Sequence, residues 1–393
     1  MPIAQFDALP EQIQDRLTWL QHMRESSPVY FDQRTKSWQV FRYEDVSRVV
    51  SDYAHFSQVD AVPSSIVAND TSFDPSYHRQ WRVLVSQALM PQTLNRLIPR
   101  ITQVTQDLLD QARHRGTMDV MQDLAYPLVV TIIAEILGLP AEQQATFRRW
   151  SDVVIYSNVN QKPKPGTSSE PRVSCWSTMQ EMAAYFTKLI AERRQNPQQD
   201  AISGLISGQI NGKFLSEREI INNCMILLVT GMETSSNLLG NAILCFDACP
   251  QALALLQQKR DLMPGAIEEV LRFLPATSDT FRITTSEVLI GDQRIPANER
   301  VRAWIASANR DAEHFVNADH FDIERDPNPH LSFGHGIHYC FGAPFARLLA
   351  SVVLPMILEQ LPGLKRAHDA PLEILDTQVV FVVKHLPVTF QAS

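Results

Sequence analysis

The stretch Phe333-Gly334-His335-Gly336-Ile337-His338-Tyr339-Cys340-Phe341-Gly342 decides how the rest of the chain is interpreted. It holds three of only 14 glycines, in a chain that uses glycine at about half its usual frequency. A glycine-rich backbone can turn its N–H groups toward one sulfur atom. The apolar run from Ala343 to Ala350 predicts a helix whose positive N-terminal end points at the same place. Both effects stabilise the thiolate of Cys340, the form of cysteine that binds a metal ion.

This stretch resembles the haem-binding loop of the cytochrome P450 family, Phe-Gly-x-Gly-x-His-x-Cys-x-Gly, with every fixed position filled. The resemblance implies that Cys340 is the axial thiolate ligand of the iron of haem b. It also implies that Phe333, Gly334, His338 and Gly342 belong to the haem site. A buried structural cysteine near a turn is the alternative for a free thiol. The complete pattern favours the haem ligand.

The bulk composition excludes some classes of function. The chain has 393 residues and a formal charge of −8, which argues against general nucleic-acid binding. Its five cysteines are widely spaced and odd in number, which fits a reducing compartment. The first ten residues lack the basic and apolar regions of a signal peptide, and the apolar stretch 224–229 is too short to cross a bilayer. We therefore expect a cytoplasmic protein without a membrane anchor.

Hydrophobic periodicity predicts a mainly α protein with a small β region. No linker divides the chain, so we expect one domain over 1–393, with a β-rich N-terminal part of about 1–75 packed on a helical body. The resemblance implies the cytochrome P450 fold, with the haem between a long central helix and the helix after Cys340. Helices are predicted over 82–89, 97–111, 128–137, 175–194 and 216 to about 258, β character over 37–43, 284–304 and 379–383, and loops over 57–74 and 158–171.

A second motif, Leu227-Leu-Val-Thr-Gly-Met-Glu-Thr-Ser-Ser-Asn-Leu-Leu239, places a glycine and consecutive hydroxyl residues inside a helical run. These residues cost a helix up to about 1 kcal/mol each relative to alanine. By itself the motif is equally a helix kink with satisfied hydroxyls. The resemblance implies an acid–alcohol pair, Glu233 and Thr234, that delivers protons during oxygen activation. It also implies that Gly231 lets a ligand or water approach the helix backbone.

The third motif is Glu269-Val-Leu-Arg272, whose charged ends lie on one helix face at i and i+3. As a surface pair it would contribute little to stability. The resemblance implies instead a buried ion pair, completed by Arg325, whose disruption costs about 3–5 kcal/mol. We expect Glu269, Arg272 and Arg325 to act in folding and haem retention rather than in catalysis.

Four basic side chains are candidates for binding the haem propionates. His78 and Arg82 lie at i and i+4, on one face of the predicted helix. The resemblance gives this segment two propionate ligands and implies that Arg282 and His338 are the other two. Each residue taken alone could be ordinary surface charge.

The substrate pocket is expected to be lined by small or apolar side chains, which favours a terpenoid, a steroid or a fatty acid. For each residue, ordinary core packing is the alternative. By family position the candidates are Val62, Ile66, Val67, Thr230, Ala276, Thr277 and Phe281.

The resemblance implies a haem-thiolate monooxygenase that inserts one atom of O2 into a lipophilic small molecule. Only 53 residues follow Cys340, so electrons are expected from a separate ferredoxin and ferredoxin reductase, with NAD(P)H as the ultimate donor. An acidic partner would meet Arg347 and nearby basic residues. A peroxide-driven peroxygenase is one alternative, although such members replace the acid–alcohol pair. A non-catalytic haem-binding protein is the other, and it would not need that pair.

Overall fold

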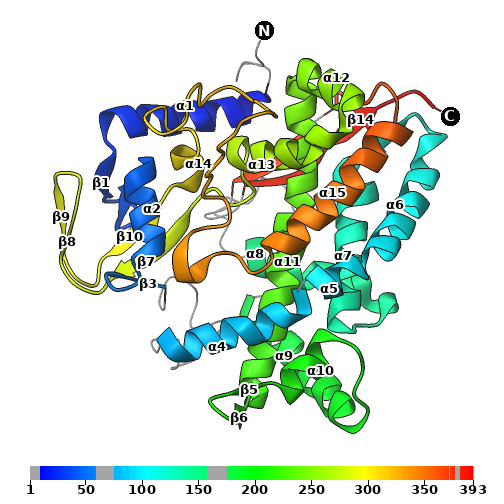
Figure 1. The fold of residues 1–393 in the computed structure, drawn as a ribbon, viewed down its shortest axis with the longest axis horizontal. Helices are drawn as coiled ribbons and strands as arrows, with labels where there is room; N and C mark the ends of the chain where they lie inside the picture. Colours follow the sequence, from blue (N-terminus) through cyan, green and yellow to red (C-terminus); the bar gives the residue numbers. More distant parts are fainter. Residues whose placement is uncertain are drawn as a thin grey trace, which may run out of the picture.

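The structure is a computed structural model that describes residues 9–58, 75–89, 91–156, 175–370, 372–376 and 381–392. Figure 1 shows a large helical body beside a smaller β-rich region, which agrees with the predicted mainly α class. The helices are α1 (Glu11–Ser26), α2 (Tyr43–Ser51), α4 (Pro75–Ser86), α5 (Pro91–Asn95), α6 (Ile98–Arg113), α7 (Tyr126–Leu137), α8 (Gln144–Tyr156), α9 (Cys175–Gln195), α10 (Ala201–Ser207), α11 (Glu217–Ala248), α12 (Pro250–Gln258), α13 (Met263–Phe273), α14 (Ile305–Ala308) and α15 (Ala343–Gln360).

The strands form one larger sheet and several short ones. The five-stranded sheet has the order β1-β2-β10-β7-β3, with β2 and β10 parallel and the other neighbours antiparallel. Its strands are β1 (Val29–Asp32), β2 (Ser37–Val40), β3 (Phe56–Ser57), β7 (Thr280–Thr284) and β10 (Arg300–Ala303). The others are β4 (Thr117–Asp119), β5 (Gln209–Ile210), β6 (Lys213–Phe214), β8 (Val288–Ile290), β9 (Gln293–Ile295), β11 (Lys365–Arg366), β12 (Glu373–Asp376), β13 (Phe381–His385) and β14 (Pro387–Thr389).

The larger sheet joins strands of the N-terminal part to strands from later in the chain, and the expected division into a β-rich part of about 1–75 and a helical body stays a prediction. Its central strand β10 and its neighbour β7 come from the later part of the chain, between α13 and α14. The N-terminal strands β1 and β2 pair with each other, and β2 also pairs with β10, which extends the sheet. A separate apolar core, which includes Val40, Val46 and Val301, holds this region together.

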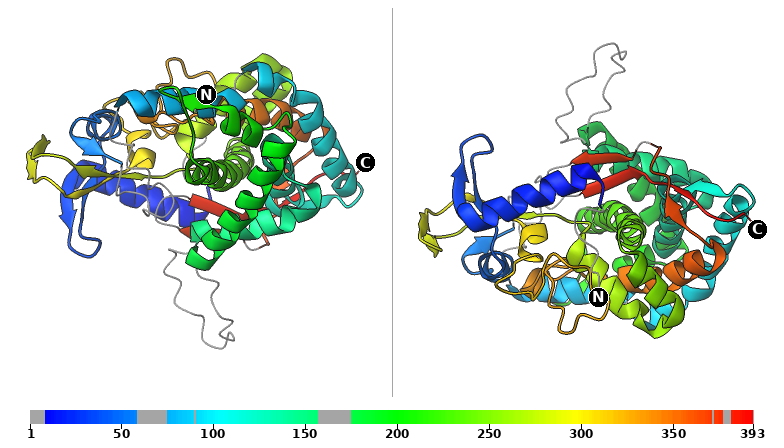
Figure 2. Two further views of the ribbon diagram at one scale, coloured as in Figure 1. Left: turned by 90° about the horizontal axis from the view of Figure 1, so that it is seen from below. Right: turned by 90° about the horizontal axis from the view of Figure 1, so that it is seen from above.

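Helix α11 runs through the middle of the molecule, and Figure 2 shows it almost end-on with other helices around it. Its 32 residues span about 48 Å at 1.5 Å per residue. A capping box starts it, since the Ser216 side chain accepts from the backbone N–H of Glu219 and the Glu219 carboxylate accepts from that of Ser216. Helices α7, α8, α9 and α15 pack on it.

The run predicted as one helix from 216 to about 258 is two helices. Pro250 starts α12 after Cys249, and the axis bends by 104° between α11 and α12. Proline lacks a backbone N–H and restricts the preceding residue, which explains why the first helix ends there. The helix predicted over 82–89 begins earlier, as α4 (Pro75–Ser86), and the other helices lie within a few residues of their predicted bounds. The predicted loop 158–171 and most of the loop 57–74 lie outside the described residues.

Two described segments, Val120–Leu137 and Ala343–Gln360, are long and apolar enough to cross a membrane by length and composition alone, and α11 with α12 would count as a third if taken as one broken span. The first begins with a π-helical turn, Val120–Ala125, and continues as α7. Of that segment 78% is buried inside the protein, and of the second 44%. Burial in a core accounts for the apolar character of the first segment. The expected absence of a membrane anchor stays a prediction.

Candidate functional site

The loop before α15, residues 333–342, directs several groups at Cys340. The Cys340 N–H donates to the Phe333 carbonyl oxygen at 2.7 Å, which closes the loop. The backbone amides of Gly342 and Ala343 donate to the sulfur. Burial raises the pKa of the Cys340 thiol, while these amides and the nearby guanidinium of Arg82 act in the opposite direction. The loop therefore supplies the donors that a bound thiolate needs.

Two glycines give this loop its shape. Gly334 and Gly336 have φ values of +70° and +71°, a region that side chains with a Cβ rarely adopt. A Cβ on Gly336 would lie 3.1 Å from the Cα of Ser51 at the end of α2. The loop is thus pressed against α2, which explains why glycine is needed there.

Four basic side chains gather beside the loop. His78 and His338 lie edge to face with ring centroids 4.7 Å apart. Arg82 of α4 donates to the carbonyl oxygen of Tyr339 in the loop. Helix α4 is held in this position by Trp81, whose indole N–H donates to the Asn223 side chain of α11 at 2.9 Å.

This cationic group is not neutralised by the described residues. Burial, followed by the charges of Arg282, His78 and Arg82, lowers the pKa of His338 to about 3. Arg282 is buried, which lowers its pKa to about 10, and its Nε has no hydrogen-bond partner in the described part of the chain. Buried cations without anionic partners are unfavourable. The arrangement therefore fits an anionic ligand group lying between His78, Arg82, Arg282 and His338.

On α11, the acid and the alcohol of the second motif face different surroundings. Glu233 is buried, with 1% of its surface exposed. Its carboxylate accepts at 2.9 Å from both the Tyr126 hydroxyl and the Asn237 amide. Thr234 is partly exposed, and its hydroxyl donates to the Thr230 carbonyl oxygen at 2.7 Å. The helix stays α through this turn, because its hydroxyls bond carbonyls one turn earlier.

Gly231 has a packing role in this structure. A Cβ on it would lie 2.9 Å from Cδ1 of Ile133 on α7, so the glycine allows α7 and α11 to pack closely. This packing by itself explains why residue 231 is a glycine. The expected approach of a ligand to its backbone stays a prediction.

The third motif forms a buried ion network. Arg272 donates to both carboxylate oxygens of Glu269 at 2.8 Å, and neither side chain is exposed. Arg325 lies 3.2 Å from the same carboxylate. Arg272 also donates to the carbonyl oxygens of Asn309, Ala318 and His320. Helix α13 is thereby tied to the segment 309–325 that leads into the cysteine loop.

A neighbouring carboxylate, Glu268, binds the two ends of the cysteine loop. Arg347 on α15 donates to both of its oxygens at 2.7 Å, and His330 lies 3.1 Å from one of them. The hydrogen bonds and charges of Arg347 and His330 outweigh burial and lower the pKa of Glu268 to about 2. The Arg347 guanidinium also lies 4.6 Å from the ring centroid of Phe333. Arg347 therefore stabilises the loop, and the expectation that it meets an acidic redox partner stays a prediction.

The candidate substrate residues divide into three groups. Val62, Ile66 and Val67 lie outside the described residues. Thr230 is exposed on α11, while Ala276 and Thr277 follow α13 and are buried and half-buried.

Phe281 lies on the opposite face of β7 from Arg282. It precedes Arg282 on β7, and successive side chains of a strand point to opposite faces. Arg300 and Arg302 lie 4.8 and 5.2 Å from its ring centroid. Phe281 therefore faces away from the cationic group, and its expected place in the substrate pocket stays a prediction.

Sequence reasoning missed Tyr126, Asn237 and Glu268. Tyr126 comes from a segment remote from α11, so nothing local indicated it. Asn237 could have been found, since it lies one helical turn after Glu233. Glu268 stands directly before Glu269, and the doubled glutamate was the signal available.

Comparison with known families decides what this site belongs to. A family model for cytochrome P450 matches residues 1–259 and 255–392. The chain belongs to the cytochrome P450 family. It is therefore a haem-thiolate monooxygenase, as the cysteine loop predicted, and family membership implies a haem.

Relatives of this cytochrome P450 match over nearly their full length. It is 37% identical to putative cytochrome P450 YjiB of Bacillus subtilis, over 90% of this chain and 89% of that protein. It is 36% identical to erythromycin C-12 hydroxylase of Saccharopolyspora erythraea, over 96% of this chain and 95% of that protein. The crystal structure of CYP109E1 from Bacillus megaterium in complex with testosterone matches with a TM-score of 0.84 and 32% identity, covering 95% of this chain and 99% of that chain.

Proposed function

We propose that this cytochrome P450 hydroxylates an apolar small molecule of the steroid, terpenoid or fatty-acid class in the cytoplasm. It would use haem b and O2, with electrons from NAD(P)H through a separate ferredoxin and ferredoxin reductase. The observation that carries the proposal is Cys340, with two backbone donors on its sulfur, beside four basic side chains that lack an anion. A haem would satisfy both needs at once, because its iron would take the thiolate as a ligand and its two propionates would pair with the basic side chains.

The haem would be held by residues from three parts of the chain, which are α4, β7 and the cysteine loop. Cys340 would bind the iron, and His78, Arg82, Arg282 and His338 would bind the propionates. When bound, the haem supplies oxygen activation, and the thiolate adds electron density to the iron. The Glu269–Arg272–Arg325 network would keep the loop in place so that the haem is retained, because breaking such a buried network is costly.

Glu233 and Thr234 would move protons in this site. Thr234 holds its hydroxyl at the partly exposed face of α11, while Tyr126 and Asn237 hold the Glu233 carboxylate inside the protein. Glu233 would leave these partners to take a proton from water and pass it toward the Thr234 hydroxyl. Tyr126 would act as a positioning residue that sets how often Glu233 is free.

The substrate class follows from the side chains that remain available around this face. Thr230, Ala276 and Thr277 are small and carry no charge, so they suit an apolar ligand with few polar groups. CYP109E1, which shares 32% identity with this chain, was crystallised in complex with testosterone. We therefore place steroids first among the candidate substrates.

A binding and turnover panel tests this proposal. Testosterone, a monoterpene and a long-chain fatty acid are titrated while the haem spectrum is followed. Products are then measured with a surrogate ferredoxin, its reductase and NADPH, or with hydrogen peroxide alone. We expect a spectral shift and a hydroxylated product with at least one compound, and only when electrons are supplied.

Other outcomes identify the alternatives. Turnover with peroxide but not with the redox proteins would indicate a peroxygenase. Haem binding without any product or compound-dependent NADPH consumption would indicate a non-catalytic haem protein. An unchanged spectrum in Cys340→Ala would contradict the assignment of the iron ligand.

A further inference from the structure

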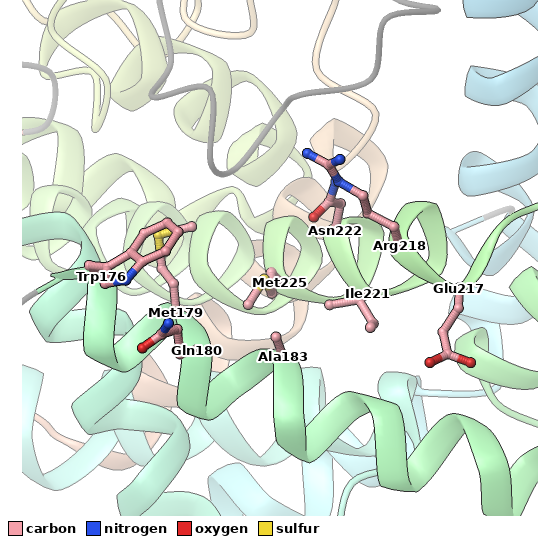
Figure 3. A pocket seen from close by; sticks show the side chains of 9 residues that line it. All are labelled: Trp176, Met179, Gln180, Ala183, Glu217, Arg218, Ile221, Asn222 and Met225. Atoms are coloured by element: carbon pink, nitrogen blue, oxygen red, sulfur yellow. The ribbon is translucent and has the colours of Figure 1, made fainter.

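A pocket of about 350 Å³ lies between the N-terminal halves of α9 and α11. Figure 3 shows side chains from both helices around it. Apolar and polar side chains both line it. The lining residues are Trp176, Met179, Gln180, Ala183, Glu217, Arg218, Ile221, Asn222 and Met225.

Two polar groups of this pocket lack partners in the described part of the chain. Asn222 is only 8% exposed as a whole residue, and its side-chain amide makes no hydrogen bond there. Arg218 makes no ion pair there, whereas the neighbouring Glu217 is neutralised by Arg194 at 2.7 Å. Figure 3 shows Arg218 and Asn222 projecting side by side from α11. The amide of Asn222 and the guanidinium of Arg218 can therefore both donate hydrogen bonds to a ligand in this pocket.

The apolar part of the pocket is suited to a flexible chain. Met179 and Met225 are adaptable side chains that fill irregular space. Trp176 leaves 61% of its surface exposed, which is unusual for so large an apolar residue. The volume falls within the range of small-molecule sites.

The pocket is separate from the proposed oxygen-activating face. Twelve residues separate Asn222 from Thr234 on the same helix. At 3.6 residues per turn, their side chains point about 120° apart around the axis. The pocket lies on the side of α11 that faces α9, whereas the side chain of Thr234 points to a different side of α11.

We propose that this pocket is a second small-molecule site, which binds an amphipathic carboxylate of the fatty-acid type. The guanidinium of Arg218 and the amide of Asn222 donate to the carboxylate. The hydrocarbon chain lies on Met179, Met225 and Trp176. A neutral lipid of the same length lacks the group that Arg218 recognises.

Calorimetric titration of the haem-loaded protein with sodium dodecanoate tests this site. An imidazole ligand of the iron, whose binding is followed in the haem spectrum, blocks the substrate pocket throughout. We expect one saturable dodecanoate site under these conditions, and weaker binding of dodecanol. Loss of a charge-assisted hydrogen bond should weaken dodecanoate binding about tenfold in Arg218→Ala.

Two further variants make the test specific. Asn222→Leu removes an unpaired amide, so the free protein should be no less stable to urea while dodecanoate binding weakens. Arg96→Ala removes an exposed arginine after α5 and should bind dodecanoate like the wild type. Absence of saturable binding with the iron blocked would overturn the proposal. So would unchanged affinity in both Arg218→Ala and Asn222→Leu.

Discussion

At the scale of single residues, Arg282 shows how a buried charge can indicate a ligand-binding site. Its guanidinium bonds only the Thr280 hydroxyl and the Phe281 carbonyl oxygen in the described structure. Its Nε is buried without a partner. A charge left in this state lowers the stability of the protein unless a ligand supplies the anion.

We therefore expect Arg282→Met to separate folding from haem binding. Haem should transfer from this variant to apomyoglobin about tenfold faster, because a charge-assisted hydrogen bond to a propionate is lost. The stability of the haem-free protein to urea should not fall. Arg96→Met, which changes an exposed arginine, is the control. A haem transfer rate equal to that of the control would exclude Arg282 from the propionate site.

Tyr126 is the residue whose role the sequence alone concealed. Its hydroxyl bonds the Glu233 carboxylate, and Arg148 lies 4.6 Å from its ring centroid. It therefore connects α11 with the helix that begins at residue 126.

We expect Tyr126→Phe to change proton delivery but not haem content. Loss of one hydrogen bond of about 1 kcal/mol should alter the position of Glu233 several-fold. The ratio of product to NADPH consumed and the solvent isotope effect should both change by about that factor. Tyr185→Phe removes a hydroxyl from an aromatic cluster on α9 and is the matched control. Identical values in the two variants would show that Tyr126 does not position Glu233.

At the scale of elements, α13 anchors the cysteine loop through two adjacent carboxylates that act differently. Glu269 is buried in the network with Arg272 and Arg325. Glu268 is partly exposed and links Arg347 of α15 to His330. One carboxylate therefore fixes the segment that precedes the loop, and the other holds its two ends together.

Glu269→Gln should lower the free energy of unfolding by about 3–5 kcal/mol, since it leaves two arginines without their carboxylate in a buried site. Glu287→Gln is the control, because Glu287 pairs with Arg294 at the surface with 62% and 76% of the side chains exposed. That change should cost at most about 1 kcal/mol. Urea unfolding of both variants measures the difference, and equal losses would contradict a buried network.

Glu268 makes a prediction about pH. Its pKa in the folded protein is about 2, below the ordinary value of 4.5. It therefore contributes stability above about pH 4.5, and this contribution is lost as the pH falls toward about 2. Glu268→Gln should be less stable than the wild type near neutral pH, and the two should converge as the solution is acidified. Unfolding in urea along a pH series measures this, and a constant difference would contradict the assignment.

At the scale of the whole molecule, a net charge of −8 opposes an acidic electron donor. A ferredoxin would need a local basic surface on this protein. The charge of Arg347 is partly offset there by its ion pair with Glu268. Arg79 is exposed on α4, the helix whose Arg82 bonds the cysteine loop (Figure 1).

We expect Arg79→Glu to slow reduction by ferredoxin several-fold at low salt, with the difference disappearing as salt screens the charges. Arg34→Glu changes an 82%-exposed side chain between β1 and β2, and should have no effect. Stopped-flow reduction of the haem measures both. Equal rates would place the docking surface elsewhere.

The sequence by itself determined the family, the mainly α class and the loop that carries Cys340. A glycine-rich loop followed by a helix is a local pattern, so it can be recognised without the tertiary structure. The Glu269–Arg272 ion pair could also be predicted from the sequence, because residues at i and i+3 lie on the same face of a helix. Only the tertiary structure decided that Tyr126 bonds Glu233, that Arg347 is held by Glu268, and that Phe281 faces away from Arg282. These contacts form between segments that are far apart in the sequence and meet only when the protein packs. A local sequence pattern does not show which distant segments will meet.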